Sequence, residues 1–365
     1  MAYNGNGSIY GPMSGSGSGQ NGAPIPPISH APRVENRVKA EEWWYTENGR
    51  SYDTFRRGKY MFPMDEGEMD RMDIFHKFFL VARRDDNASY GGLCLRPLPH
   101  HPRILDLGCG TGIWVIDMAD RHGGDADIIG WDLSLIQPLR IPPGVEFQRC
   151  DIEEPWTGVA ESSFDLIHMK MLAGSIENWA SLYSQALRYL KPETGVLEHV
   201  EIDFTPKCED GALPEDSSLR IWAHELTVAM ERARRPITAN PHTVALLERL
   251  GFVDVRQVSK RVPFNSWPPD ETEREMGKWF NLEGNMLPCD EILLHHELGT
   301  FGQREDHLSL ANEREQFFGS LQRNHWTGYS PPWTSMALAE KTYHFLYAGS
   351  PSIFKWIKEL LTGSL

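Results

Sequence analysis

From residue 103 onward, short apolar runs alternate with stretches in which apolar side chains recur every three or four positions. Ile104, Leu105 and Leu107 form the first apolar run, and helical spacing begins at Ile113. Short apolar runs predict buried strands, and the wider spacing predicts helices packed on one face. Their alternation predicts an α/β fold with a mostly parallel sheet and helices on both faces. The predicted strands are 103–107, 127–132, 145–151, 163–169, 195–204, 252–258 and 260–264, the last two forming an antiparallel edge, and the helices are 113–121, 179–190, 215–235 and 240–250.

The segments on either side of this alternation have a different character. Residues 1–37 are rich in Gly, Ser, Asn and Pro, a composition that buries too little apolar surface to fold, so we predict a disordered tail. Residues 38–102 are predicted to form an aromatic-rich, helical N-terminal cap on a core domain at 103–265. Residues 266–365 predict a helical C-terminal extension packed on that core.

The cap contains one strong helix signal. Between Asp65 and Arg84 the apolar and aromatic side chains fall at helical spacing. Asp65 is a suitable N-cap, with Glu68 three residues later. A cap of this kind favours a lid that excludes water from a ligand pocket. Tyr52 and Tyr60 are the candidates to contact a substrate from the lid.

A glycine turn follows the first strand, with Gly108, Gly110 and Gly112 at alternate positions. A dinucleotide fingerprint requires Gly-x-Gly-x-x-Gly or Ala, and Ile113 stands at its third glycine. A phosphate-binding P-loop requires a Lys after its last glycine, and none follows Gly112. An acid followed by Gly-x-Gly-x-Gly resembles the first motif of class I S-adenosylmethionine-dependent methyltransferases. The resemblance implies a Rossmann-like fold that binds S-adenosylmethionine.

Acids stand at or near the ends of three predicted strands: Asp106, Asp132 and Asp151. Ligands of open α/β sheets bind outside the carboxyl ends of the strands, and an acid after the second strand accepts ribose hydroxyls. Asp151 suits an adenine amino group, and Ile152 suits the ring face. The candidate cofactor residues are Asp106, Gly108, Cys109, Gly110, Asp132, Leu133, Asp151, Ile152 and Met169.

Catalytic residues are harder to identify than cofactor residues. A sulfonium methyl group is already an electrophile, so a base is needed only when the nucleophile arrives protonated. His168 near the end of the fourth strand and His199 on the fifth are the candidates. A packed histidine is the commoner role of such a residue. The five Cys contain no C-x-x-C pair, so no metal site is predicted.

Charge and hydropathy exclude two classes of partner. The formal net charge is −15, which disfavours direct, sequence-specific nucleic-acid binding. No apolar run approaches the roughly 20 residues that a membrane span requires, and no signal-peptide hydrophobic region opens the sequence.

A closer resemblance covers about residues 45–265. Short segments in this region together resemble the LaeA-like methyltransferases of filamentous fungi. Ser134 and Leu135 stand where LaeA itself has a short Ala-Pro link, and this departure indicates a paralogue. The segments are NGRSY at 48–52, RRGKY at 56–60, PMDE at 63–66, DRMDIFH at 70–76, LDLGCGTGIW at 105–114, DL at 132–133, IQP at 136–138 and VEIDF at 200–204.

This resemblance implies a seven-stranded class I fold and a protein of the nucleus and cytoplasm. It also implies a role in regulating development and secondary metabolism, in complexes with velvet-type or membrane-tethering proteins. Two alternatives stay open on the residues alone. In the first alternative, the chain is a tailoring methyltransferase for a secondary metabolite. In the second, it is a regulatory module that binds S-adenosylmethionine without significant turnover.

Overall fold

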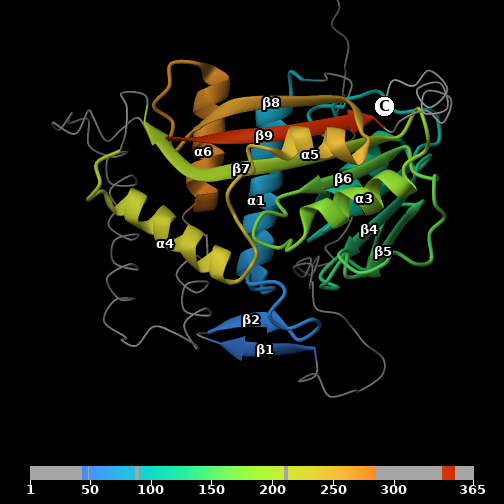
Figure 1. Ribbon diagram of the computed structural model, residues 1–365, viewed down its shortest axis with the longest axis horizontal. Coiled ribbons are helices and arrows are strands. Elements are labelled where there is room, and N and C mark those ends of the chain that lie inside the picture. The colour runs from blue at the N-terminus through green and yellow to red at the C-terminus, as the bar shows by residue number, and fades with distance from the viewer. Residues whose placement is uncertain (1–42, 48, 87–89, 209–212, 285–338, 350–365) are drawn as a thin grey trace, which may run out of the picture.

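A seven-stranded sheet forms the centre of the computed structural model, which describes residues 43–47, 49–86, 90–208, 213–284 and 339–349. The strand order is β5-β4-β3-β6-β7-β9-β8 (Figure 1). All pairs from β5 to β7 are parallel, and β9 runs antiparallel between β7 and β8. The mostly parallel sheet of seven strands is therefore confirmed. The bounds are β3 (Arg103–Leu107), β4 (Asp127–Asp132), β5 (Val145–Arg149), β6 (Leu166–Lys170), β7 (Val196–Cys208), β8 (Val253–Pro263) and β9 (Ala339–Gly349).

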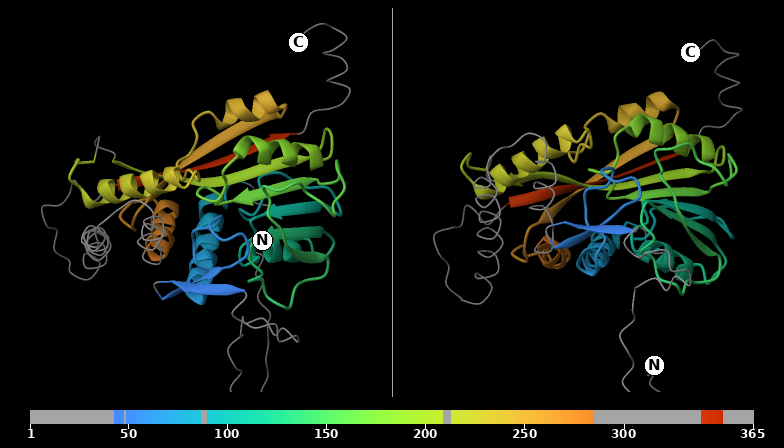
Figure 2. Two further views of the ribbon diagram at one scale, coloured as in Figure 1. Left: turned by 60° about the horizontal axis from the view of Figure 1, so that its bottom comes forward. Right: turned by 90° about the horizontal axis from the view of Figure 1, so that it is seen from below.

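Helices cover both faces of the sheet, as Figure 2 shows. On one face lie α3 (Trp179–Tyr189) and α5 (Thr243–Leu250), and on the other lie α1 (Glu66–Arg83), α2 (Ile113–Arg121) and α6 (Glu271–Gly284). The remaining helix, α4 (Ser218–Arg232), contacts β7. Among the described residues, no helix is long and apolar enough to cross a membrane.

The end of the sheet differs from the sequence prediction. Residues 252–258 and 260–264 were predicted as two antiparallel strands, but the single strand β8 spans Val253–Pro263. The antiparallel strand is β9, which lies in the predicted helical extension. The aromatic residues Tyr343, Phe345 and Tyr347 alternate along its sequence, which favours a strand, and its pairing partners are distant in sequence. The predicted tail and the other residues of the extension beyond α6 lie outside the described ranges.

The cap begins with a hairpin, so its predicted helical character holds only for α1. Strands β1 (Trp44–Glu47) and β2 (Arg50–Asp53) pair antiparallel. Asp65 caps α1 as predicted, because its side chain accepts the backbone N–H of Glu68 at 3.1 Å. The same carboxylate accepts Arg50 Nε at 2.7 Å. Asp65 therefore joins the hairpin to the helix.

The core holds α1 against the sheet. Phe75, Phe78 and Phe79 of α1 are almost completely buried in a cluster that includes Val200 and Ile202 of β7. Burying a phenylalanine side chain contributes roughly 1.5–3 kcal/mol. The cap is therefore an integral part of the domain, and its residues have fixed positions beside the carboxyl ends of the strands.

Candidate methyl-donor site

The glycine turn connects β3 to α2 at the centre of the sheet. Gly108, Gly110 and Gly112 have φ values of +68°, +54° and +78°, a region that residues with a side chain rarely adopt. Gly110 N donates to Asp132 Oδ2 at 2.7 Å. The turn thus fixes the first two strand ends relative to each other.

A pocket opens where β3, β4 and β6 end. Its cavity measures about 150 Å³, less than the roughly 300 Å³ of a typical small-molecule site. Of the nine predicted cofactor residues, eight line it: Asp106, Gly108, Cys109, Gly110, Asp132, Leu133, Asp151 and Ile152. The topology therefore brings together residues from three separate segments of the sequence, 106–110, 132–133 and 151–152.

Met169 is the predicted cofactor residue that does not line this pocket. Its side chain is fully buried in the core between the sheet and α3. Successive side chains of a strand point to opposite faces, so the next residue, Lys170, lies on the pocket side instead. Lys170 was not among the predicted site residues, although its place at the end of the fourth core strand was a usable signal.

Lys170 has an unusual environment for a lysine. Its Nζ lies 3.0 Å from His76 Nδ1, and His76 Nε2 lies 2.9 Å from Asp117 Oδ2. Burial lowers the pKa of Lys170 to about 8, although Asp106 and other nearby acids oppose this shift. A lysine with such a pKa is partly neutral near physiological pH and can accept a proton.

Asp106 and Asp132 are buried acids with raised pKa values. Burial raises the pKa of Asp106 to about 8 and that of Asp132 to about 6. Hydrogen bonds from the N–H groups of Gly110 and Ser134 act against the shift at Asp132. A bound cation would favour the ionised form of both carboxyl groups.

Neither predicted catalytic histidine lines this pocket. His168 is fully buried, stacks on Trp114 with ring centroids 3.8 Å apart, and its Nδ1 lies 2.7 Å from Asp106 Oδ1. Burial lowers the pKa of His168 well below its ordinary value. His168 therefore orients Asp106 from outside the pocket. His199 lies at a second cavity on the other side of the sheet from α1.

The cap supplies one wall of the pocket. Lys59 Nζ contacts Asp151 Oδ2 at 2.6 Å, and Arg56 Nε lies 3.4 Å from the same oxygen. Asp151, the acid predicted to bind an adenine amino group, is thus paired with two basic residues of the cap. This pairing narrows the cavity. Tyr60 lines the pocket as predicted. Tyr52 does not, because it is buried against Tyr45 in the hairpin, with ring centroids 5.5 Å apart.

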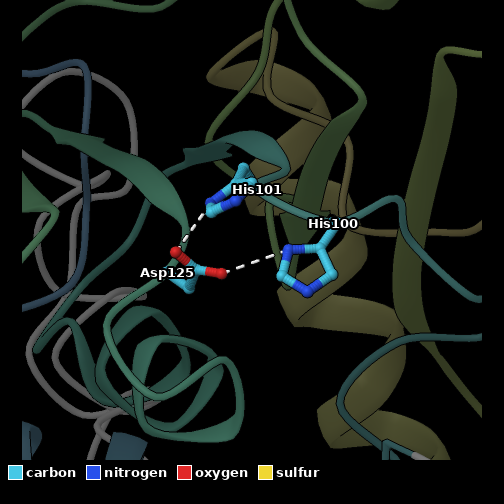
Figure 3. A group of neighbouring side chains, drawn as sticks. All are labelled: His100, His101 and Asp125. Atoms are coloured by element: carbon cyan, nitrogen blue, oxygen red, sulfur yellow. Dashed lines mark ion pairs between the residues drawn. The ribbon is translucent and has the colours of Figure 1, made fainter.

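A separate group of polar side chains lies near the amino ends of β3 and β4, away from the carboxyl ends that form the pocket (Figure 3). His100 and His101 precede β3 and pair with Asp125, which precedes β4, at 3.2 and 2.6 Å. All three side chains are exposed, and their ligand atoms lie within 4.8 Å of one another. They lie where the parallel strands begin, so they take no part in the pocket.

The residues of the pocket fit S-adenosylmethionine better than a phosphate-bearing nucleotide. Asp106, Asp132 and Asp151 would repel phosphates, whereas an amino group, a sulfonium and ribose hydroxyls suit carboxylates. Asp132 keeps acceptor capacity after its two backbone contacts, because a carboxylate offers about four lone-pair sites. A mostly parallel sheet with this strand order, turn and set of acids defines a class I methyltransferase.

Comparison with known proteins identifies the family. A family model described as a methyltransferase domain matches residues 76–257. The secondary metabolism regulator LAE1 of Cochliobolus heterostrophus is 50% identical over 250 residues, covering 67% of this chain and 79% of the relative. The secondary metabolism regulator laeA of Fusarium oxysporum is 40% identical over 261 residues, covering 71% and 80%. The chain belongs to the LaeA-like methyltransferases.

Solved structures share the fold only distantly. Phosphoethanolamine N-methyltransferase 2 of Haemonchus contortus, in complex with S-adenosyl-L-methionine, is 18% identical with a TM-score of 0.42, covering 78% of this chain and 52% of that one. This likeness carries no conclusion about substrate, and the family assignment rests on the sequence relatives.

The raised pKa values of the acids predict a pH dependence of donor binding. Affinity for S-adenosylmethionine should increase from pH 6 to pH 8, because Asp132 (pKa about 6) and Asp106 (about 8) must ionise to hold a cation. Loss of the Lys170 proton, at a pKa of about 8, acts in the same direction. Calorimetric titration at pH 6, 7 and 8 measures the effect.

The stability of the ligand-free protein should change with the opposite sign. Both folded acids have pKa values above the reference value of 3.8, so the folded state binds more protons than the unfolded chain between that value and the raised ones. Their contribution to stability is present at low pH and declines as pH rises through the window. For the donor-binding prediction, an affinity for S-adenosylmethionine that falls or stays constant from pH 6 to 8 would contradict the role of these two acids.

Proposed function

We propose that this chain transfers a methyl group from S-adenosylmethionine and, through that activity, regulates secondary metabolism. The observation that carries the proposal is the set of three carboxylates around the glycine turn, in a chain 50% identical to a secondary metabolism regulator. Three carboxylates that line one pocket support the binding of a cationic nucleoside donor.

The pocket residues have separate roles in this reaction. When bound, the donor supplies a sulfonium methyl group as the electrophile. Asp132 is placed to accept the ribose hydroxyls, and Asp106, oriented by His168, to pair with the amino group. Lys59 must leave Asp151 for that acid to contact an adenine. Lys170 is the group placed to accept a proton from an incoming nucleophile, with His76 and Asp117 behind it.

The other end of the pocket supports an apolar or aromatic acceptor. Phe62, Phe75, Phe79 and Phe204 line it on the side of the cap and β7. Aromatic walls exclude water and bind flat or apolar groups. They favour an acceptor whose nucleophilic atom is carried on an aromatic or apolar framework, either in a metabolite or beside apolar side chains of a protein. The metabolite-tailoring alternative is supported by this observation and by nothing else in the pocket.

Methyl incorporation separates an enzyme from a binding module. The purified full chain is incubated with extract and radiolabelled S-adenosylmethionine, and the label is followed in protein and small-molecule fractions. Asp132→Ala should lose both donor binding and labelling. Lys170→Met should keep donor binding and lose most labelling, because a thioether does not accept the proton. Label that persists with Asp132→Ala, or wild-type protein that binds donor but labels neither fraction, would contradict the enzymatic role.

We propose that the regulatory role is exercised in complexes with velvet-type or membrane-tethering proteins, in both the nucleus and the cytoplasm. The names of the relatives support a regulatory role, and the family resemblance alone supports these partners and these two compartments. Affinity purification of the tagged chain, with imaging of the same tag, tests it. Recovery of the chain without such proteins, or its absence from the nucleus, would contradict the respective part.

A further inference from the structure

A second cavity of about 340 Å³ lies beside the methyl-donor pocket, on the α3 and α5 side of the sheet. Side chains from α3, α5, β7, β8 and the segment 236–241 line it. Ala173 borders both cavities.

Glu201 gives this cavity its charge. Its carboxylate is the only acidic group among the described lining residues, and no lysine or arginine is among them. The three hydrogen bonds that Glu201 accepts all end on Oε1: from Leu172 N at 2.7 Å, Ala173 N at 2.9 Å and His199 Nε2 at 3.0 Å. Glu201 is 8% exposed. Its other oxygen, Oε2, is buried and has no hydrogen-bond partner among the described residues. An unsatisfied buried carboxylate oxygen is costly and calls for a donor.

Aromatic rings surround this acid. Trp179 lies with its ring centroid 4.9 Å from that of His199 and 5.5 Å from that of Tyr183. Tyr183 Oη lies 3.0 Å from His199 Nδ1, so a Tyr183 donor and a His199 Nε2–H donor toward Glu201 form one consistent chain. Both ring nitrogens of His199 are therefore occupied, and His199 serves to position Glu201.

We propose that the second cavity binds a primary alkylammonium group, with its N–H donors on Glu201 Oε2 and its alkyl chain against the aromatic walls. A charge-assisted hydrogen bond would satisfy the buried oxygen, and the half-buried ring of Trp179 offers apolar surface to the alkyl chain. An anion would meet the carboxylate without any cationic partner. A metal ion would find a single free carboxylate oxygen, fewer ligands than such ions take.

Occupation of this cavity has a direct route to the donor pocket. The other oxygen of Glu201 holds the backbone of Leu172 and Ala173, which line the donor pocket. A ligand that fixes the Glu201 carboxylate therefore also fixes this wall. The ligand site itself does not depend on the proposed methyl transfer, and it can be tested without any turnover.

The test is binding of n-butylammonium chloride to the full chain, observed by ligand-detected NMR and by calorimetry. We expect a dissociation constant of about 1 mM, typical of so small a ligand. Tetramethylammonium, which has charge but no N–H donor, and 1-pentanol, which has neither charge nor an ammonium group, should each bind at least tenfold more weakly. Equal binding of all three ligands, or no binding of n-butylammonium, would overturn the proposal.

Variants locate the binding to this cavity. Glu201→Gln keeps the shape of the side chain and should weaken butylammonium binding at least tenfold, whereas Glu161→Gln, an exposed acid paired with Arg188, should leave it unchanged. Ala239→Trp, on the half-buried cavity wall, should block binding and provides a second test should Glu201→Gln fail to fold. Unchanged butylammonium binding in folded Ala239→Trp would overturn the proposal, and S-adenosylmethionine binding, measured in parallel, would still report on the donor site.

Discussion

Gly108→Val is expected to reduce affinity for S-adenosylmethionine by about two orders of magnitude. Gly108 has φ +68° and lines the donor pocket. An L-residue in this region costs roughly 1–2 kcal/mol, and a β-branched one is a stronger outlier. A Cβ here would also lie 2.4 Å from Leu172 Cδ2, which borders the same pocket. Relief of the backbone strain moves the turn that lines the donor pocket, and relief of the contact moves the Leu172 side chain that lines the same pocket. About 1.4 kcal/mol corresponds to tenfold in affinity.

Gly123→Val is the matched control for this prediction. Gly123 has φ +62° in the turn after α2, and a Cβ there meets nothing within 4 Å. It carries comparable backbone strain away from the pocket. Equilibrium dialysis with labelled donor should show near-normal binding for Gly123→Val and a large loss for Gly108→Val. Equal affinities in the two folded variants would remove the glycine turn from the site.

Glu198→Ala is expected to lower the free energy of unfolding by about 3–5 kcal/mol, the usual cost of leaving one member of a buried ion pair alone. Glu198 of β7 contacts Arg83 at the end of α1, and the two residues are 0% and 2% exposed. Its other oxygen accepts Leu95 N at 3.0 Å. Removal leaves a buried guanidinium and a backbone N–H without this acceptor. Urea unfolding of the full chain measures the loss.

Two comparisons make the origin of this loss clear. Glu161→Ala removes an exposed partner of Arg188, and exposed pairs contribute little, so its unfolding midpoint should not move measurably. The double change Arg83→Met with Glu198→Leu should recover much of the stability, because replacing both charges avoids the uncompensated one. A Glu198→Ala midpoint equal to that of Glu161→Ala would refute the importance of the buried pair.

Much of the core was predictable because its signals are local. The strands at 103–107 and 127–132 and the helix at 113–121 have the observed bounds, since each is a clear apolar pattern bounded by Gly, Pro or charged residues. Strand β9 was missed because its place is decided by pairing with β7 and β8. Nothing in the local sequence of residues 339–349 says which distant strands they join.

The site divides in the same way. The carboxyl ends of parallel strands meet at one edge, so the acids Asp106, Asp132 and Asp151 could be grouped from sequence. The pairing of Asp151 with Lys59 could not, because it depends on how the cap folds back. The pocket side of β6 was likewise decided by the register of the strand, which places Lys170 in the pocket and Met169 in the core. His168 was named as a candidate base beside the commoner role of a packed histidine, and its stacking on Trp114 is a tertiary contact that the local sequence does not reveal.

Calorimetric titration of the full chain with S-adenosylmethionine at pH 8 tests the central claim most directly. The account predicts saturable binding of one donor per chain, and loss of that binding in Asp132→Ala, whose carboxylate closes the turn at Gly110. No binding at millimolar donor, or equal binding by Asp132→Ala, would contradict the assignment of this pocket as the methyl-donor site.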